Sequence, residues 1–285
     1  MMHTDRMRGE LAALLRSHRE ALQPEDLGFS RGKRRRSRGL RREEVASLAD
    51  VSTSWYMWLE QGRDIQPSLH SLLRVARALQ LSDSEWLYAS LLAGFGKADQ
   101  VCEGSDEVPS LASIQPMLDA FLGVPAALIN SRFEILSCNA AARAVYGRDV
   151  AHGDKWERNT LWRFFTDPVR RQMYPDSVMD RGIRNLIGAL RLNWANADDG
   201  GTAIQELVDR LRSDSAEFDL LWRRREVSKL STVPGCVRPL GSKTAISIAY
   251  TRLSIPNAPE YIVGVLVPTD SVSAIALERH LNQVG

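Results

Sequence analysis

Three side chains suited to molecular recognition follow one another along a short segment. Ser54, Trp58 and Gln61 stand at positions i, i+4 and i+7, and residues three or four apart on an α-helix are neighbours on its surface. A hydroxyl, an indole and an amide in one row can form hydrogen bonds and pack against flat rings, but they offer no acid–base pair. The row therefore indicates binding rather than catalysis.

A run of positive charge precedes this row. Its members are Arg31, Lys33, Arg34, Arg35, Arg36, Arg38, Arg41 and Arg42, with no acidic residue among them. Residues 1–97 carry 16 Lys and Arg against 12 Asp and Glu, a net of +4, whereas the rest of the chain carries 21 against 23, a net of −2. Such a block favours an anionic partner, although a solvated, flexible face is the alternative.

Two short helices would position the recognition row. The spacing of apolar residues predicts helices over Arg41–Ala49 and Ser52–Gln61, with Ser52 as N-cap of the second and Gly62 as its stop. Their shared core would consist of Val45, Ala46, Leu48, Val51, Tyr56 and Leu59. A second helix held in this way can enter a DNA major groove by its N-terminal end. Residues 39–62 therefore predict a helix-turn-helix, and beside it the basic run is best interpreted as a set of phosphate contacts.

The same apolar spacing extends over the N-terminal third of the chain. It predicts further helices over 7–22, 68–79 and 82–92, the last opened by a capping box of Ser82 and Glu85. We expect a compact all-α, five-helix domain over residues 1–97. Residues 98–113 lose the apolar period and are predicted to be a linker.

Residues 114–285 mix strands and helices. Ala126–Asn130 and Phe133–Ser137 predict a hairpin, and Ala245–Tyr250 and Tyr261–Val267 predict two later strands. Helical patterns fill the sequence between these strand pairs, and Ser271–Leu281 closes the chain as a helix. We therefore predict an α+β fold for the whole protein, with one antiparallel sheet covered by helices in this domain.

Several classes of function find no support in the sequence. The three cysteines and five histidines are scattered, so neither a metal site nor a disulfide framework is expected. The segment from Gly235 to Thr244 superficially resembles a phosphate loop. However, five residues separate its glycines where the motif has four, and Pro239 removes an N–H that such a loop needs. No apolar run reaches the ~18–20 residues of a membrane span. We expect a cytoplasmic protein that is not an enzyme and needs no cofactor.

Residues 7–94 resemble the helix-turn-helix of the phage-repressor-like (XRE) regulator family. The matching residues are Gly39-Leu40, Glu44-Val45-Ala46, Val51-Ser52, Leu59-Glu60-Gln61-Gly62, Pro67-Ser68, Leu72 and Ala76-Arg77-Ala78-Leu79. The resemblance implies that Arg42 contacts phosphate, and it places Gln61 and Arg63 near the DNA backbone. It implies that Thr53, Ser54 and Trp58 face base edges; together with Arg36, Arg38 and Arg41 of the basic run, these are the predicted DNA-binding residues.

Trp58 departs from this family's pattern, which often has a polar residue there. An indole has one donor and no acceptor, so it cannot make the two-bond contact that Gln or Asn makes to adenine. Packing on a thymine methyl or a sugar is the DNA-binding interpretation. A core or partner-facing aromatic is the alternative.

Residues 114–281 resemble the ligand-binding domain of MmyB-like transcription regulators, a PAS-like fold. The matching residues are Pro125-Ala126, Asn139, Ala141-Ala142, Gly147, Asn159-Thr160-Leu161, Phe164-Phe165-Thr166-Asp167-Pro168, Arg171, Tyr174, Leu207, Leu211, Ser213, Ser215, Phe218, Leu221-Trp222, Val227 and Pro239-Leu240-Gly241. The sequence departs from the family at Arg238, where His is frequent, and at Ser177-Val178, where Trp is frequent. The resemblance implies a small apolar, fatty-acid-like ligand.

Five large aromatic residues are candidates for the lining of the ligand pocket, with ordinary core packing as the alternative for each. They are Phe133, Trp162, Phe165, Trp194 and Trp222.

Taken together, these patterns predict a sequence-specific transcriptional regulator that binds double-stranded DNA as a homodimer and senses a small apolar ligand. One alternative is a protein-interaction module that uses the Trp-rich helix and has lost DNA binding. A second alternative, an enzyme in residues 114–285, has no catalytic constellation to support it.

Overall fold

The chain forms two compact units in the computed structural model, which describes residues 2–29, 39–95, 111–147, 150–197, 201–228, 233–255, 258 and 260–284. The first unit comprises Met1–Gln100 with Trp194–Gly201, and the second comprises Val101–Asn193 with Thr202–Gly285. Among the described helices, none combines the length and apolar character needed to cross a bilayer. Of the linker predicted at 98–113, residues 98–110 lie outside the described part of the chain, and a helix already begins at Leu111.

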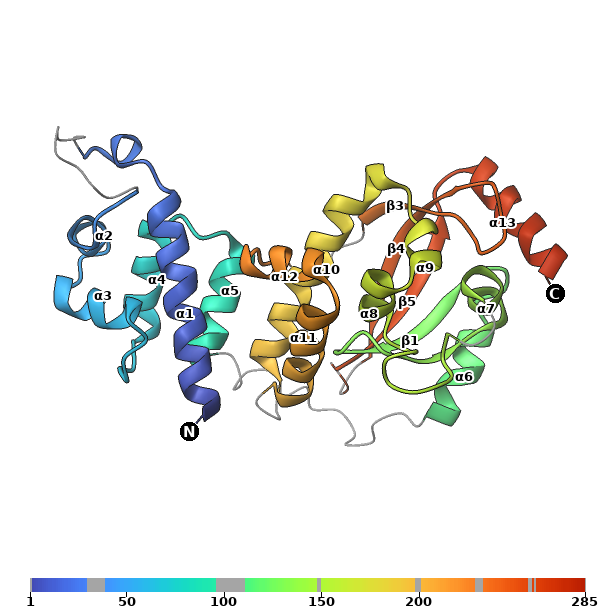
Figure 1. Cartoon of the computed structure of the whole chain (residues 1–285), viewed down its shortest axis with the longest axis horizontal. Helices are drawn as coiled ribbons and strands as arrows, with labels where there is room; N and C mark the ends of the chain where they lie inside the picture. The colour runs from blue at the N-terminus through green and yellow to red at the C-terminus, as the bar shows by residue number, and fades with distance from the viewer. Residues whose placement is uncertain are drawn as a thin grey trace. The chain divides into compact units, whose positions relative to one another are not determined.

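The first unit contains the five predicted helices (Figure 1). The first begins earlier than predicted, at Met2 rather than at residue 7, and a short 3-10 turn, η1 (Pro24–Leu27), follows it. The helices are α1 (Met2–Ala21), α2 (Arg42–Leu48), α3 (Thr53–Glu60), α4 (Leu69–Ala78) and α5 (Asp83–Leu92).

Hydroxyl caps define where these helices start. The Ser52 hydroxyl accepts from the Trp55 N–H at 3.2 Å, and Ser82 and Glu85 form the predicted capping box at α5. Each cap satisfies backbone N–H groups that the first turn of a helix leaves without partners. Gly62, at φ +67°, ends the stretch that contains α3, as predicted.

The α2–α3 turn sets the angle between the two helices. Asp50 adopts a left-handed φ of +49°, and the Val51 N–H returns to the Ala46 carbonyl at 3.0 Å. This arrangement buries Ala46 at the helix crossing, as predicted. The prediction was wrong for Leu48, which is 40% exposed and lines a surface groove together with Leu27 of η1.

The second unit is built on the predicted antiparallel sheet, which confirms the α+β class. Its five strands follow the order β2-β1-β5-β4-β3, with every neighbouring pair antiparallel. The strands are β1 (Ala126–Asn130), β2 (Ile135–Cys138), β3 (Val233–Val237), β4 (Ile246–Ser254) and β5 (Tyr261–Pro268). Strand β3 was not predicted; it pairs Gly235 with Ile248, so the start of the phosphate-loop-like segment forms a strand at the edge of the sheet.

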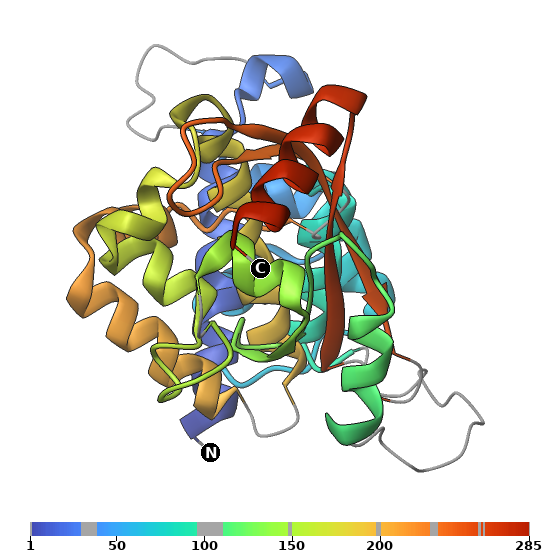
Figure 2. The ribbon, with the colours of Figure 1, turned by 90° about the vertical axis from the view of Figure 1, so that its right-hand side faces the viewer.

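Helices cover this sheet. The predicted hairpin, helices between the two strand pairs and the closing helix α13 are present, whereas α6 was not predicted. The helices are α6 (Leu111–Asp119), α7 (Ala140–Tyr146), α8 (Thr160–Thr166), α9 (Pro168–Gln172), α10 (Asp176–Asn196), α11 (Thr202–Asp214), α12 (Ala216–Arg223) and α13 (Ser271–Val284). In Figure 2 the dark red α13 lies over the sheet close to α7, and its contacts with α7, β4 and β5 agree with that view.

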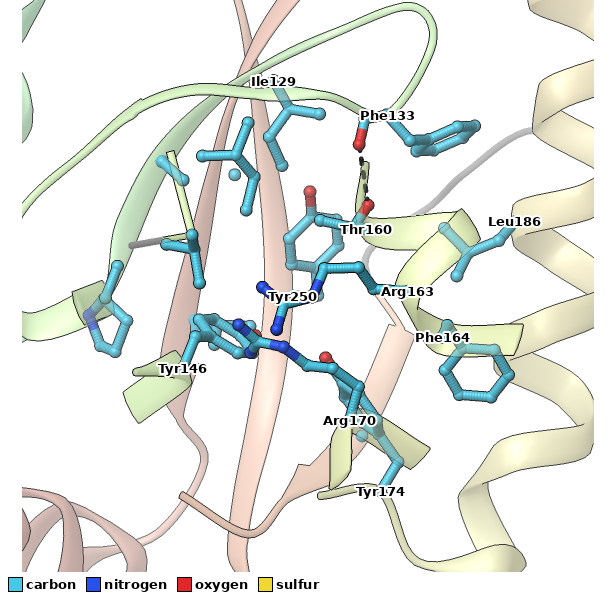
Figure 3. Close-up of a pocket in the computed structure, with 18 of the residues that line it drawn as sticks. Ile129, Phe133, Tyr146, Thr160, Arg163, Phe164, Arg170, Tyr174, Leu186 and Tyr250 are labelled. Carbon is cyan, nitrogen blue, oxygen red and sulfur yellow. Dashed lines mark hydrogen bonds between the residues drawn. The ribbon is translucent and has the colours of Figure 1, made fainter. Parts of the chain in front are cut away.

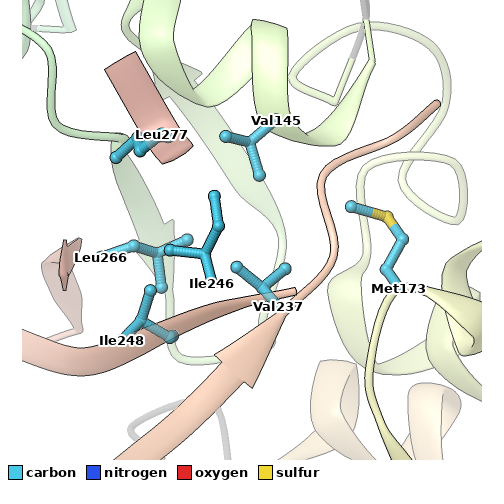
Figure 4. Packing of buried hydrophobic residues seen from close by; sticks show 7 residues of the cluster. All are labelled: Val145, Met173, Val237, Ile246, Ile248, Leu266 and Leu277. Atoms are coloured by element: carbon cyan, nitrogen blue, oxygen red, sulfur yellow. The ribbon is translucent and has the colours of Figure 1, made fainter. Parts of the chain in front are cut away.

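The two faces of the sheet bury different side chains. All five residues of β1 are buried; Ala126 and Leu128 pack with α6, whereas Ala127 and Ile129 face α7. The cluster on the α7 and α13 side contains Val145, Met173, Val237, Ile246, Ile248, Leu266 and Leu277 (Figure 4). Because β1 is apolar on both faces, both faces of the sheet have to be covered by helices at this strand.

One buried amide joins three elements of the second unit. The Asn139 Oδ1 atom accepts from the backbone N–H of Ala126 and of Ala142, at 3.1 and 2.9 Å, and so links β1 to the start of α7. The Asn139 Nδ2 atom lies within hydrogen-bond distance of the carbonyl oxygens of Leu118, Phe121 and Val124, at 3.2, 3.1 and 2.8 Å. Asn139 is 3% exposed, so water cannot replace these bonds.

Asn139→Ala should therefore lower the free energy of unfolding of the second unit by roughly 2–4 kcal/mol, because buried polar groups would be left without partners. Urea unfolding followed by tryptophan fluorescence measures this loss. Asn193→Ala is a suitable control, since that half-buried amide donates a single bond, to the Ser131 carbonyl at 2.7 Å. Equal losses in the two variants would contradict the proposed role of Asn139.

Candidate functional site

The predicted recognition residues of α3 lie on the surface. Thr53, Ser54, Trp58, Gln61 and Arg63 are all exposed, and Trp58 keeps 39% of its surface accessible. The structure thus brings these five predicted residues to the outside of one short helix and the turn after it. Trp58 is not a core residue of its own unit, which removes one of the two alternative interpretations of this position.

Trp58 has a cationic neighbour. The Arg63 guanidinium carbon lies 6.0 Å from the centroid of the Trp58 ring, and the Arg63 Nε atom donates to Gln61 Oε1 at 3.0 Å. A guanidinium near an aromatic face is attracted by the ring quadrupole. The three side chains form one polar-aromatic surface at the C-terminal end of α3, whereas Trp55 at its start is half-buried.

The predicted phosphate-binding arginines differ in their surroundings. Arg41 is exposed at the start of α2, where its backbone N–H donates to Glu44 Oε2 at 2.6 Å. Arg42 is half-buried and bonds the Glu60 carboxylate through Nε and a terminal nitrogen, at 2.9 and 2.8 Å. Arg36 and Arg38 lie outside the described residues.

Glu60 is the centre of a buried polar cluster that joins three helices. Its carboxylate has no accessible surface. The Arg19 guanidinium donates two hydrogen bonds to it, from Nε at 2.6 Å and from a terminal nitrogen at 2.9 Å. The Tyr56 hydroxyl donates to it at 3.0 Å, and Arg16 lies 3.6 Å away. We call Arg16, Arg19, Arg42, Tyr56 and Glu60 the Glu60 cluster; it ties α1, α2 and α3 together.

The charge of Glu60 is well compensated. Burial is the strongest single influence and acts to raise the pKa of Glu60, but the hydrogen bonds from Arg19, Tyr56 and Arg42 outweigh it, so the pKa falls below the ordinary value of 4.5. For Tyr56, burial and the nearby carboxylate both raise the pKa, which keeps its hydroxyl protonated as a donor. The cluster therefore holds an ionised carboxylate inside the unit.

The Arg19 side chain also fixes the approach to α2. It donates to the Leu40 carbonyl at 3.0 Å, while the Leu40 N–H donates to the Arg19 carbonyl at 2.9 Å. Gly39 has φ +75°, and a Cβ atom there would lie 2.4 Å from the Arg19 carbonyl oxygen. Only glycine fits such a close backbone approach. Gly39, Leu40 and Glu60 belong to the helix-turn-helix motif in the sequence, but no sequence pattern indicates their contact with α1.

The second unit contains a cavity of about 240 Å³ between the sheet and its helices. Figure 3 shows side chains entering it from the sheet, from α7 and from the α8–α9 region. Its walls are largely apolar, with Ile129, Ile135, Phe164, Leu186 and Leu266 among the lining residues. We call this space the sheet cavity.

Of the five aromatic residues predicted to line a pocket, Phe133 lines the sheet cavity. The other four are not among its lining residues. Trp162 donates through Nε1 to Asp214 Oδ2 at 2.9 Å, and Trp194 packs against Gly201. Phe165 meets Phe218 edge to face, with ring centroids 5.3 Å apart, whereas Trp222 stacks on Phe218 at 5.7 Å. Trp162 and Phe165 thus connect α8 to α11 and α12 rather than shaping the cavity.

One end of the sheet cavity is polar. Tyr146, Tyr174 and Tyr250 bring hydroxyls to it, and Arg163 and Arg170 point toward the same place (Figure 3). Burial raises the pKa of Tyr250 to about 12 and raises that of Tyr146 well above 10, so all of these hydroxyls remain donors at neutral pH. The alternation of Ile246, Ile248 and Tyr250 in the sequence was a usable signal for Tyr250, and Tyr174 was one of the residues that match the family. Tyr146, Arg163 and Arg170 had no such signal.

A helix-turn-helix with an exposed polar face, followed by an α+β unit with an apolar cavity, defines the class of ligand-responsive transcription regulators. A family model described as a helix-turn-helix domain matches residues 10–87, and the model of the MmyB-like transcription regulator ligand binding domain matches residues 112–279. The second match covers more than half of the chain, so the protein belongs to the MmyB-like family.

These matches confirm the predicted helix-turn-helix and ligand-binding domains. Both families are regulatory rather than enzymatic. A comparison with curated proteins found no match for the chain.

Glu60→Gln should destabilise the first unit by about 3–5 kcal/mol, because it leaves buried arginine charge uncompensated. A group with a lowered pKa stabilises the fold above its unfolded pKa, here near 4.5, and that contribution disappears as the pH falls through the lower folded value. Unfolding measured from pH 7 down to pH 3 should therefore show a smaller acid-induced loss in Glu60→Gln than in the wild type.

Asp50→Asn is the matched control, since it makes the same acid-to-amide change in an exposed pair with Arg74 at 2.7 Å. An exposed pair contributes at most about 1 kcal/mol. A loss of that size for Glu60→Gln as well would show that the Glu60 cluster does not hold the helices together.

Proposed function

We propose that this protein is a one-component regulator of the phage-repressor-like (XRE) type, whose affinity for a specific DNA site responds to a small apolar ligand. The observation that carries the proposal is the pairing of an outward-facing polar row on a helix-turn-helix with an apolar cavity in the unit that follows. Because a ligand shifts an equilibrium only by its difference in affinity for two states, the DNA-competent and incompetent states must differ at the sheet cavity.

The exposed face of α3 supports sequence-specific reading of DNA. Thr53 and Ser54 stand in the first turn, the part of a recognition helix that meets base edges. Their hydroxyls can both donate and accept, so they can bond several base edges. Arg41, with its exposed side chain before α2, is suited to a phosphate contact that adds affinity but carries no sequence information.

The small size of this reading surface supports the proposal of a homodimer on a two-fold related DNA site. One short helix contacts few bases, and two heads on half-sites one helical turn apart combine their specificity.

The walls of the sheet cavity support a fatty-acid-like ligand. Their aliphatic and aromatic side chains would bury a hydrocarbon chain, and each buried methylene contributes about 0.8 kcal/mol. Native mass spectrometry of the purified full-length protein tests both proposals together, because it reports subunit number and any retained small molecule. A monomer without bound lipid, even after incubation with decanoate, would contradict them.

Thr53→Ala with Ser54→Ala should abolish preference for the specific site while leaving non-specific binding intact, since each lost base contact costs about 1–3 kcal/mol of discrimination. Gel shifts against the DNA upstream of the protein's own gene, with scrambled DNA of equal length as competitor, measure the ratio of specific to non-specific affinity. Both side chains are exposed, so the fold should be unaffected. Retention of the full ratio would rule out these residues as readers.

Arg41→Ala should instead weaken binding to every sequence and reduce the slope of log K against log salt by about 0.9, the value for one phosphate contact on duplex DNA. Binding is measured across a salt series from low to physiological ionic strength. Arg212→Ala, which removes a half-exposed arginine paired with Asp219 in the second unit, is the control and should leave the slope unchanged. An unchanged slope in Arg41→Ala would exclude the phosphate contact.

Trp58→Ala separates DNA binding from the alternative of a protein-interaction module. If Trp58 packs on a thymine methyl or a sugar, its loss should weaken specific binding roughly fivefold to tenfold. Fluorescence anisotropy with the specific duplex measures this change, and Trp58→Phe should restore part of it. Unchanged DNA affinity in Trp58→Ala would favour a partner protein as the target of this exposed aromatic.

A further inference from the structure

Arg16 of α1 is an exposed arginine at the edge of the Glu60 cluster. Its Nε atom lies 3.6 Å from Glu60 Oε1, and 50% of its side-chain surface is accessible. Among the described residues this ion pair is the interaction that Arg16 makes, and at 3.6 Å it is too long to be a hydrogen bond. A guanidinium has five N–H donors, so most of the donors of Arg16 face solvent.

The Glu60 carboxylate has its hydrogen bonds without Arg16. Its donors are Arg19 at 2.6 and 2.9 Å, Arg42 at 2.9 and 2.8 Å, and the Tyr56 hydroxyl at 3.0 Å. Two guanidinium groups thus already compensate one buried negative charge. Arg16 adds a third positive charge, which the fold does not need in order to bury Glu60.

The surplus positive charge of the Glu60 cluster lies at the surface. The second acid bound to the cluster, Glu20, pairs with Arg19 at 3.1 Å. Arg19 is the enclosed arginine, with 8% of its side chain accessible, whereas Arg16 and Arg42 have 50% and 38% accessible. The two arginines that only share the Glu60 carboxylate are therefore those that reach solvent, where a further anion can bind them.

Arg16 lies beside the start of α2. Arg42, the first residue of α2, bonds the same oxygen that Arg16 faces, Glu60 Oε1, so the two guanidinium groups are neighbours. The Leu40 N–H donates to the Arg19 carbonyl at 2.9 Å and holds the approach to α2 against α1. In a helix-turn-helix the first helix crosses the DNA backbone. A phosphate backbone that passes the start of α2 therefore also passes Arg16.

We propose that Arg16 contacts a DNA backbone phosphate next to Arg42, so that the DNA-binding surface extends from the helix-turn-helix onto α1. The guanidinium fork matches a phosphate with two parallel bonds. The long ion pair with Glu60 orients the Arg16 side chain and leaves its donors available. This inference rests on the proposed DNA binding and adds a contact from a helix that precedes the helix-turn-helix of residues 39–62.

Fluorescence anisotropy with the full-length protein tests the contact across a salt series. The two probes are the duplex upstream of the protein's own gene and a scrambled duplex of equal length. Arg16→Gln should weaken binding to both duplexes roughly tenfold at low salt and reduce the slope of log K against log salt by about 0.9. The ratio of specific to non-specific affinity should stay unchanged, because a phosphate contact carries no sequence information.

Two further variants assign the effect to this position. Arg16→Lys should keep most of the slope, because it retains the point charge without the fork. Arg6→Gln is the matched control, since Arg6 is another exposed arginine of α1 and lies about 15 Å away along the helix axis. It should leave the slope unchanged. Equal reductions in Arg6→Gln and Arg16→Gln would indicate diffuse attraction by positive charge and would overturn the inference.

Thermal unfolding of the wild type and of Arg16→Gln, with and without inorganic phosphate at constant ionic strength, separates the remaining outcomes. We expect phosphate to act equally on both proteins. Stabilisation confined to the wild type, with an unchanged salt slope in Arg16→Gln, would assign the site to a free anion and overturn the inference. An unchanged slope with lower stability would make Arg16 a structural partner of Glu60 alone. A wild type that shows no salt-dependent binding would instead contradict the proposed DNA binding itself.

Discussion

The first unit depends on the cost of burying a carboxylate. Glu60 is fully enclosed, so its charge must be met inside the protein, and the groups that meet it come from three helices: Arg19 from α1, Arg42 from α2 and Tyr56 from α3 itself. A buried charge tolerates little displacement of its partners. The Glu60 cluster therefore adds to the α2–α3 turn in holding the two helices at a fixed angle, and the outer face of α3 stays exposed.

Two buried polar side chains of the second unit differ in the bonds that they make. Asn139 is surrounded by backbone partners that use its amide fully, and it joins the sheet to α6 and α7. Arg170 is nearly as deeply buried but faces an apolar cavity beside a second arginine. A buried polar group whose bonds are all made holds its elements together, whereas a buried charge beside a like charge costs free energy that the rest of the fold must offset.

The predictable parts of the structure were those governed by local physics. Ser52, Ser82 and Gly62 marked helix ends because capping depends on a few adjacent residues. The aromatic residues proposed for the ligand pocket were less predictable. Trp162 and Trp222 have the size and apolarity of pocket residues, but whether an aromatic side chain fills a core or lines a cavity depends on the segments that pack against it.

The sequence by itself determined the division into two domains, the helix-turn-helix, the exposed row from Ser54 to Gln61 and the antiparallel sheet. Periodicity and capping predict these features because they depend on neighbouring residues. Only the tertiary structure decided that Arg42 bonds the buried carboxylate of Glu60. It also decided that Tyr146, Arg170 and Tyr250 meet at one end of a cavity. These contacts join residues far apart in the chain. Their energies depend on burial and on the surrounding charge, and neither quantity exists until the chain has folded.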